Sequence, residues 1–204
     1  MSIIALPLNL AYNEFAWGVN TYELEESSDQ TGNTATRIIA PPRWTAHFTS
    51  IHQMTLVQAA RWEALMLSLR GGNVLALYDV VRYNPAGSLR GSPTLASSLA
   101  VGATTATFSS AAGGVKQGDW LQFGSGFGSS QLVKIMADAD PSGGSLSVVF
   151  ENPIRKVISS GSVVVWDKPV AYFRRTSRSA TLGMYDTSGT GQGGFSVDLM
   201  ERFS

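Results

Sequence analysis

The residues best suited to chemistry in this sequence are its two histidines, His47 and His52. An imidazole can act as a general base or as a metal ligand near neutral pH. His47 lies on the polar face of a predicted strand, and neither a cysteine nor another histidine joins it as a ligand. An exposed polar residue is therefore the preferred interpretation. A Ser-His-Asp triad stays open, although the sequence has no G-x-S-x-G segment that would expose a nucleophile.

Two glycine-rich segments have sequences that partly match those of ligand-binding loops. GSGFGSS at 124–130 lacks the Lys-Ser/Thr pair and the following helix of a phosphate loop, which favours a flexible hairpin. DADPSGG at 138–144 begins like a calcium loop, with Asp138, Asp140 and Ser142 at alternate positions. Its twelfth position is Val149 instead of a bidentate glutamate, so a β-turn capped by aspartates is the preferred interpretation.

Charged residues gather in two short segments. ELEESSD at 23–29 is the densest acidic stretch, and FRRTSR at 173–178 carries Arg174, Arg175 and Arg178. Such runs are normally solvated, but opposite signs on two stretches are also compatible with complementary edges of neighbouring subunits. No pair of carboxylates stands in a recognisable acid–base arrangement. We therefore predict no catalytic residue, no cofactor-binding residue and no metal ligand, and hence no enzyme.

Composition sets further limits on function. The 204 residues contain 15 basic and 15 acidic side chains, so no net charge attracts nucleic acid or an anionic membrane. The charged fraction is 15%, against roughly 25% in an ordinary globular chain. Small polar residues must therefore cover much of the surface, or part of it is buried in an assembly. Pro7 and Asn9 interrupt the apolar start, and the sequence has no cysteine, which favours a soluble protein of the reducing cytoplasm.

One amphipathic helix is predicted at residues 55–70. Thr55 and Gln58 have the spacing of a capping box, and the glycines at 71 and 72 supply a stop. A buried stripe is expected from the apolar residues at helical spacing, which are Ala59, Trp62, Leu65, Met66 and Leu69. A further apolar set lies off this stripe and consists of Leu56, Ala60 and Leu67. Two interpretations stay open: the helix faces both its own sheet and a neighbouring subunit, or it merely covers one sheet face.

Strand predictions surround this helix. The segment 43–50 alternates, with Trp44, Ala46 and Phe48 on one face, and 73–81 is continuously apolar, as in a fully buried strand. Farther along, turn signals separate short strand candidates at 104–108, 119–123, 131–137, 145–150 and 162–166. We therefore predict an outer domain, formed by residues 1–90 and 168–204, that carries a small β-barrel inserted at 91–167.

Four segments resemble the distal tail protein of long-tailed bacteriophages, which forms a ring at the end of the tail tube. They are the strand PPRWTAHFTSI, the single helix followed by a buried strand, the strands VKQGDWLQFG and QLVKIMADA, and the alternating segment FSVDLMERFS. The likeness spans nearly the whole chain. It is greatest to the variant found in T5-like phages, which carries an OB-type barrel in the equivalent place.

The resemblance implies a mainly β fold, namely a tail-tube-like β-sandwich with one α-helix and an inserted small OB-like β-barrel. It implies a homohexameric ring in the baseplate of a siphophage virion, synthesised and assembled in the cytoplasm of the host bacterium. The implied partners are further copies of the chain, the tail tube protein and the baseplate hub protein, with side-fibre or receptor-binding proteins as additional candidates. A membrane, a specific nucleic acid and a cofactor are not among them.

Other functions compete with this structural role. A carbohydrate-binding module of a receptor-binding apparatus is the main alternative, because OB-type barrels bind oligosaccharides. The aromatic residues that could stack on sugars are Trp120, Phe123, Phe127 and Trp166. A barrel core is the other interpretation of these residues, and strand alternation places Trp120 and Gln122 on one face with Leu121 and Phe123 on the other. A cell-wall hydrolase is disfavoured by the missing acid–base pair. Single-stranded nucleic-acid binding is disfavoured because the barrel segment has few basic residues.

Overall fold

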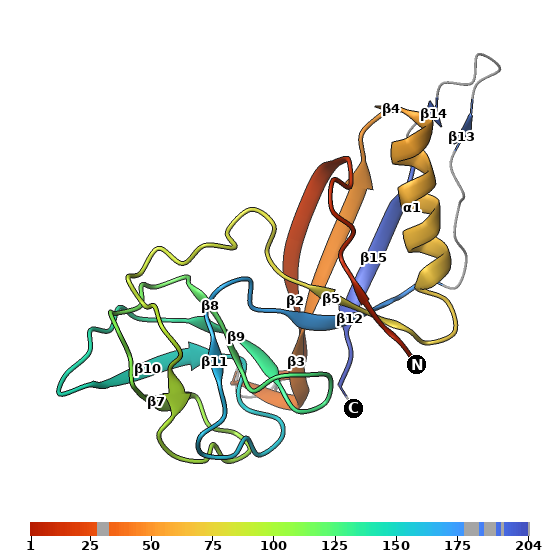
Figure 1. Ribbon diagram of the computed structural model, residues 1–204. Helices are drawn as coiled ribbons and strands as arrows, with labels where there is room; N and C mark the ends of the chain where they lie inside the picture. The colour runs from red at the N-terminus through yellow and green to blue at the C-terminus, as the bar shows by residue number, and fades with distance from the viewer. Residues whose placement is uncertain (28–32, 178–183, 186–190, 193, 204) are drawn as a thin grey trace. The chain divides into compact units, whose positions relative to one another are not determined.

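The computed structural model describes residues 1–27, 33–177, 184–185, 191–192 and 194–203, and the chain divides into two compact units (Figure 1). Unit 1 comprises Met1–Val19, Trp44–Leu77 and Tyr172–Ser204, and unit 2 comprises Asn20–Arg43 and Tyr78–Ala171. Strands dominate both units, and the described residues contain a single helix. The mainly β class predicted from the sequence is therefore confirmed.

Helix α1 spans Leu56–Ser68, and strands β2 (Tyr12–Ser27) and β3 (Thr34–Ser50) run through both units. The other strands of unit 1 are β1 (Ile3–Ala5), β4 (Gln53–Met54), β5 (Val74–Leu77), β12 (Ala171–Arg175), β13 (Met184–Tyr185), β14 (Gly191–Gln192) and β15 (Ser196–Glu201). Those of unit 2 are β6 (Thr94–Leu95), β7 (Thr105–Ser109), β8 (Trp120–Phe123), β9 (Gln131–Ile135), β10 (Ser145–Glu151) and β11 (Val164–Val165).

Unit 1 is built on a six-stranded sheet with the strand order β1-β5-β12-β15-β3-β2. β1 pairs with β5 in parallel, whereas β15 pairs antiparallel with β12 and with β3. Alternate residues of β3 are buried, which confirms the inward face predicted for Trp44, Ala46 and Phe48. The buried Glu201 of β15 is fastened to this face, because its Oε2 accepts a hydrogen bond from the Trp44 N–H at 3.0 Å.

Helix α1 packs on the sheet of unit 1 through the stripe predicted for it, since Ala59, Trp62, Leu65 and Met66 are all buried (Figure 1). The Trp62 indole stacks on Phe195 with ring centroids 5.7 Å apart. Its Nε1–H donates to the backbone oxygen of Ala11 at 2.7 Å. One side chain thus ties the helix to two other segments of unit 1.

The capping box at the start of α1 is also confirmed. Thr55 Oγ1 accepts a hydrogen bond from the Gln58 N–H at 3.3 Å, and Gln58 Oε1 accepts one from the Thr55 N–H at 2.9 Å. Both bonds satisfy amide groups that the first helical turn cannot pair internally. At the other end, Gly71 and Gly72 have φ values of 67° and 81°, so a left-handed stop closes the helix as predicted.

Thr55→Ala should lower the free energy of unfolding of unit 1 by about 1 kcal/mol, because it removes the acceptor for the Gln58 N–H. Equilibrium urea unfolding followed by circular dichroism measures the change. Gln58→Ala removes only the reciprocal bond to the Thr55 N–H and should cost less. An unchanged unfolding midpoint in Thr55→Ala would show that the box contributes nothing to stability.

Unit 2 contains a six-stranded sheet with the order β11-β8-β9-β10-β7-β6. The sheet closes on itself between β6 and β11, where the Leu95 N–H donates to Ser162 O at 2.9 Å. One apolar cluster fills the interior, with Phe123 in edge-to-face contact with Phe108 and Phe150. The five short strands predicted from the sequence are present as β7 to β11. β6 was not predicted, and it completes the ring.

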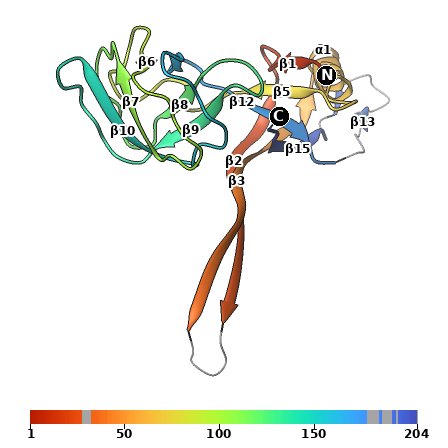
Figure 2. The ribbon, with the colours of Figure 1, turned by 90° about the horizontal axis from the view of Figure 1, so that it is seen from below.

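The parts of β2 and β3 that belong to unit 2 form a two-stranded ribbon, Asn20–Ser27 and Thr34–Arg43 (Figure 2). Its side chains are exposed or half-exposed on both faces, and they include Ile38 at 70% and Ile39 at 64% exposure. From the sequence we expected only the strand at 43–50. A ribbon without a buried face lacks apolar alternation, and prolines seldom occur inside a strand, yet Pro41 and Pro42 lie in β3.

Candidate functional site

A shallow hollow of about 310 Å³ lies on the unit 1 sheet, on the face opposite the buried one. The residues that line it include Ala16, Gly18, Thr45, His47, Thr176 and Asp198. A Cβ on Gly18 would meet Thr45 Oγ1 at 2.7 Å, so the missing side chain lets β2 and β3 approach closely. His47 Nδ1 lies 2.7 Å from Asp198 Oδ1, which makes this pair the main polar feature of the hollow.

The pair joins an imidazole and a carboxylate that are 151 positions apart in the sequence. A carboxylate on Nδ1 can orient an imidazole as a general base, but nucleophilic catalysis also needs a hydroxyl or thiol within reach of that base. Among the described residues, no hydroxyl is hydrogen-bonded to the His47 ring. Thr176 Oγ1 donates instead to the backbone oxygen of Asp198 at 3.1 Å. We therefore interpret His47 and Asp198 as a cross-strand tie between β3 and β15.

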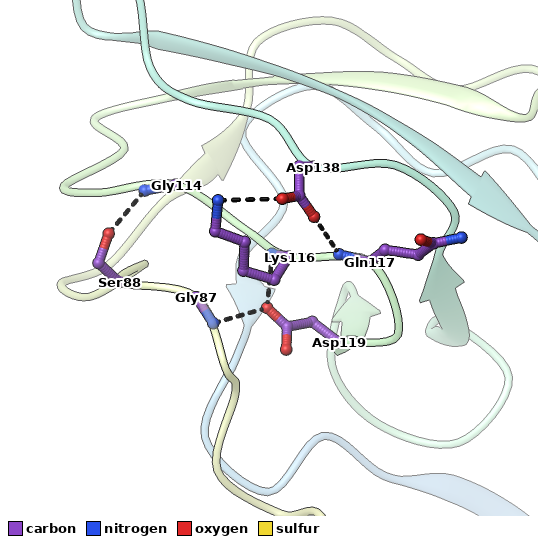
Figure 3. A network of polar contacts seen from close by, with 7 residues as sticks. All are labelled: Gly87, Ser88, Gly114, Lys116, Gln117, Asp119 and Asp138. Carbon is purple, nitrogen blue, oxygen red and sulfur yellow. Dashed lines mark hydrogen bonds and ion pairs between the residues drawn. The ribbon is translucent and has the colours of Figure 1, made fainter.

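A second polar cluster belongs to unit 2 and is centred on the buried Asp119 (Figure 3). Its carboxylate accepts backbone hydrogen bonds from Ala86 at 2.7 Å, Gly87 at 3.1 Å and Lys116 at 2.9 Å. Buried carboxylates need such partners, because an unpaired charge in the interior is costly. Asp119 thus fastens the segment that enters the barrel to the start of β8.

Asp79 is a second buried anchor, near the start of the segment that enters the barrel. It is buried, and its Oδ1 accepts the Val81 and Arg82 N–H groups at 3.0 Å, which ends the chain's extended course after Leu77. The predicted strand at 73–81 is for this reason shorter than expected. The other carboxylate oxygen of Asp79, Oδ2, accepts the Trp120 Nε1–H at 3.1 Å. Sequence reasoning missed both aspartates as anchors; the turn-forming Gly-Asp pair just before β8 was the available signal for Asp119.

The first aspartate of the calcium-like segment is hydrogen-bonded to other protein groups. Asp138 accepts the Gln117 N–H at 2.8 Å and the Lys116 ammonium at 3.0 Å (Figure 3). The bond from the Gln117 amide, followed by the bond from Lys116, lowers the pKa of Asp138, and the Asp138 carboxylate raises the pKa of Lys116. Ser142 and Ser145 close the turn by exchanging backbone hydrogen bonds, as the turn interpretation requires. Asp138 caps the distant Gln117 amide rather than its own turn.

Lys116 and Asp138 should make the stability of unit 2 depend on pH at both extremes. The folded pKa of Asp138 is depressed, so its contribution is present above the ordinary aspartate pKa and is lost as pH falls through the folded value. The folded pKa of Lys116 is raised, so its contribution is present below the ordinary lysine pKa and is lost as pH rises through the folded value. Both groups are exposed, so each effect should be small.

Thermal unfolding midpoints measured from about pH 2 to pH 6 test the acid limb, which brackets the ordinary aspartate pKa. Asp138→Asn should flatten the fall in midpoint at the acid end. It leaves the amide able to face Gln117 but without a charge for Lys116. Asp167→Asn, at an exposed aspartate of the same unit, is the matched control. Identical acid limbs for the parent and Asp138→Asn would rule out this pair as the cause.

The four aromatic residues considered for sugar stacking do not form one platform. Phe123 is buried in the apolar interior of the barrel, whereas Trp120 is buried on the other face of β8, as the alternation of this strand indicated. Trp166 is half-exposed, but its Nε1–H donates to Gly91 O at 2.9 Å and the Arg90 guanidinium lies 4.9 Å from its ring centre. Phe127 is half-exposed in the loop that joins β8 to β9. The carbohydrate-binding alternative therefore loses two of its four candidate residues.

The acidic and basic segments differ in how they are presented. The acidic residues of the ribbon are all exposed, and they are Glu23, Glu25 and Glu26. Arg174 and Arg175 are neighbours in β12, so they point to opposite faces, and Arg174 is exposed while Arg175 is partly buried. The predicted basic segment is therefore not a single patch. Asp29 and Arg178 lie outside the described residues.

Helix α1 carries a second apolar stripe directly opposite its buried one. At about 100° per residue, the side that faces away from the sheet presents Leu56, Val57, Ala60, Ala64 and Leu67, which we call the outer stripe. All five are exposed, with Leu56 at 54%, Val57 at 63% and Leu67 at 44%. The exposed side of such a helix is normally polar. The apolar set predicted off the main stripe thus lies on the surface.

No protein-family model matches the chain, and no curated protein matches it. Over the ranges that the structure describes, no group of three or more histidine, aspartate or glutamate side chains is arranged to hold a metal ion. The same ranges contain no helix of the length and apolar character that a bilayer crossing requires.

Proposed function

We propose that this protein is a structural component of a siphophage tail tip. In this proposal its copies form a ring at the distal end of the tail tube and connect the tube to the hub and host-recognition proteins. The observation that carries the proposal is the outer stripe of α1. A monomer would keep five apolar side chains in water on the side of the helix opposite its core, where a helix is normally polar.

The polar clusters favour a structural role over catalysis. His47 is engaged with Asp198, Asp119 is engaged with three backbone amides, and Asp138 is engaged with Lys116 and Gln117. Each cluster joins segments that are distant in the sequence, which is a structural task. We accordingly propose that the protein is not an enzyme and needs no cofactor.

The finer architecture belongs to the same proposal. We take the unit 1 sheet, with the small sheet β13-β14-β4, as a tail-tube-like β-sandwich, and the closed ring of unit 2 as the OB-like insertion. A single apolar core inside a ring of short strands supports the second assignment. The compact units change from one to the other at residues 77/78 and 171/172 and add Asn20–Arg43 to the barrel unit, whereas the sequence suggested an insertion at 91–167.

Native mass spectrometry of the purified protein at rising concentration, together with images of purified virions, tests the proposed function. We expect oligomers that grow toward six copies and a ring at the tail end that antibodies against the chain label. The number six comes from the family resemblance. Two-fold dimers without any larger ring, in the free protein and in the particle alike, would overturn the proposal.

A further inference from the structure

We infer that the ribbon of one copy docks on the outer stripe of helix α1 in the next copy. The inference rests on the proposed function, because a closed ring needs a heterologous interface in which two different patches meet. The chain offers two such patches, one in each compact unit. Each lacks a covering layer among the described residues, and the two differ in shape and charge.

Of the two patches, the ribbon is the one that has no layer of its own unit packed against it. An isolated two-stranded hairpin is marginally stable in water, since it has no second layer against which to bury side chains. Leu24, Ile38 and Ile39 are nevertheless between 44% and 70% exposed along it. Ile38 and Ile39 are adjacent and therefore point to opposite faces, so at least one face keeps a large branched side chain available for a partner.

The outer stripe has the shape that a ribbon can cover. Ala60 and Ala64 form a shallow centre, and the larger Leu56 and Leu67 border it at the two ends of the helix. A β-branched side chain from a strand can therefore enter between the two leucines. Small side chains at the centre of a helix face allow another backbone to approach closely.

Charge favours the ribbon over a second helix as the occupant. The ribbon exposes Glu23, Glu25 and Glu26 on β2 and Arg37 on β3, while the outer stripe has Arg61 on one flank and Glu63 on the other, with Arg70 just past the end of the helix. Arg61 makes one long contact, 3.4 Å, to the backbone of Asn9, so its guanidinium is available for a carboxylate. Opposite charges on two patches favour encounter and set register.

Two outer stripes packed antiparallel about a two-fold axis would instead place Arg61 beside the Arg61 of a second copy. The stripe is centred between Ala60 and Ala64, so residues near position 62 meet their own symmetry mates on the same flank. Like charges at such a contact oppose association. The ribbon is therefore the better occupant.

The size of the patch predicts a weak contact. A helix of 13 residues is about 20 Å long at 1.5 Å per residue, so a stripe about 10 Å wide covers about 200 Å². A stable interface buries about 800 Å² on each partner. One ribbon on one stripe should accordingly dissociate readily, and ring closure or the rest of the tail must supply the remaining stability.

Disulfide cross-linking tests the docking directly, because the natural sequence has no cysteine. Variants with Ala64→Cys and either Ile38→Cys or Ile39→Cys are oxidised, both as free protein and within particles assembled from the variant. We expect a ladder of covalent multimers for at least one of the two ribbon positions. Ala64→Cys combined with Val101→Cys, an exposed position on unit 2 outside the ribbon, is the matched control and should give no ladder.

Three other results of the same experiment would overturn the inference. Disulfide dimers of the Ala64→Cys single variant would show that two helices pair instead. Rings in parent and variant without any ladder would overturn the docking while leaving the proposed function intact. Absence of a ring from both the free protein and the particle would overturn the proposed function itself.

A charge exchange supplies an independent readout. Glu23→Lys with Glu25→Lys, and separately Arg61→Glu with Arg70→Glu, should each weaken association about tenfold or more at low salt. Mixing the two variants should restore association between copies of opposite kind. Glu14→Lys changes an exposed glutamate of β2 outside the ribbon and should leave association unchanged. Failure of the mixture to associate better than either variant alone would contradict the docking.

Discussion

Gly113→Ala should lower the free energy of unfolding of unit 2 by about 2–6 kcal/mol, because backbone strain and overpacking each cost about 1–3 kcal/mol. Gly113 has φ +93°, a conformation that side chains other than glycine rarely adopt. An added Cβ would clash with the backbone oxygen of Ser88. Neither group can move freely, since the neighbouring Leu89 and Gly114 are joined by a backbone hydrogen bond of 2.8 Å.

Gly118→Ala is a matched control for this prediction. Gly118 has the same φ of +93°, but an added Cβ would meet no heavy atom within 4 Å. This variant should therefore show the conformational cost alone, about 1 kcal/mol or somewhat more. The difference between the two unfolding free energies, measured by urea titration, isolates the clash with Ser88. Equal losses in the two variants would mean that the segments around residues 88 and 113 separate easily.

Trp62→Ala should cost unit 1 about 3–5 kcal/mol, the range for deleting a large buried aromatic side chain. Trp62 is fully buried, stacks on Phe195 and satisfies the carbonyl oxygen of Ala11. Its removal opens a cavity between helix and sheet and leaves that carbonyl without its donor. Urea unfolding monitored by circular dichroism gives the free energy.

Two further variants separate the contributions of Trp62. Trp62→Phe keeps a ring to stack on Phe195 but removes the Nε1 donor, so it should cost less than the alanine variant. Leu67→Ala truncates an exposed residue of the same helix and should change the free energy by less than about 1 kcal/mol, as is usual for surface sites. A loss below about 1 kcal/mol for Trp62→Ala would contradict the burial of the stripe.

Elements whose signals are local could be predicted from the sequence. The capping box of Thr55 and Gln58 depends on residues three positions apart, and the inner stripe of α1 repeats every three or four residues. The five barrel strands from β7 to β11 have turn signals at their ends. In each case neighbouring residues contain the information, so one sequence sufficed to find them.

Features whose partners are distant could not be predicted. β6 has two residues, too few for alternation, and it is defined by its bonds to β7 and to the segment just before β11. The anchors Asp79 and Asp119 bind groups up to 41 positions away in the sequence. His47 pairs with Asp198, and these two residues are separated by 151 positions. The ribbon escaped prediction for another reason: without a buried face, its sequence has no pattern that separates inside from outside.

The strand order of unit 1 has a consequence for the course of biosynthesis. β12 and β15 lie between β5 and β3 in the sheet, yet they are translated after the whole barrel segment. A ribosome-bound chain that has exposed residues up to 171 therefore holds every strand of the barrel but only the outer strands of the other sheet. On stalled ribosomes, we expect the barrel to become protease-resistant first. At that stage β1, β2, β3 and β5 are still protease-sensitive, because the central strands of their sheet have not been translated. Chaperones that shield unpaired strand edges should engage the chain during that interval.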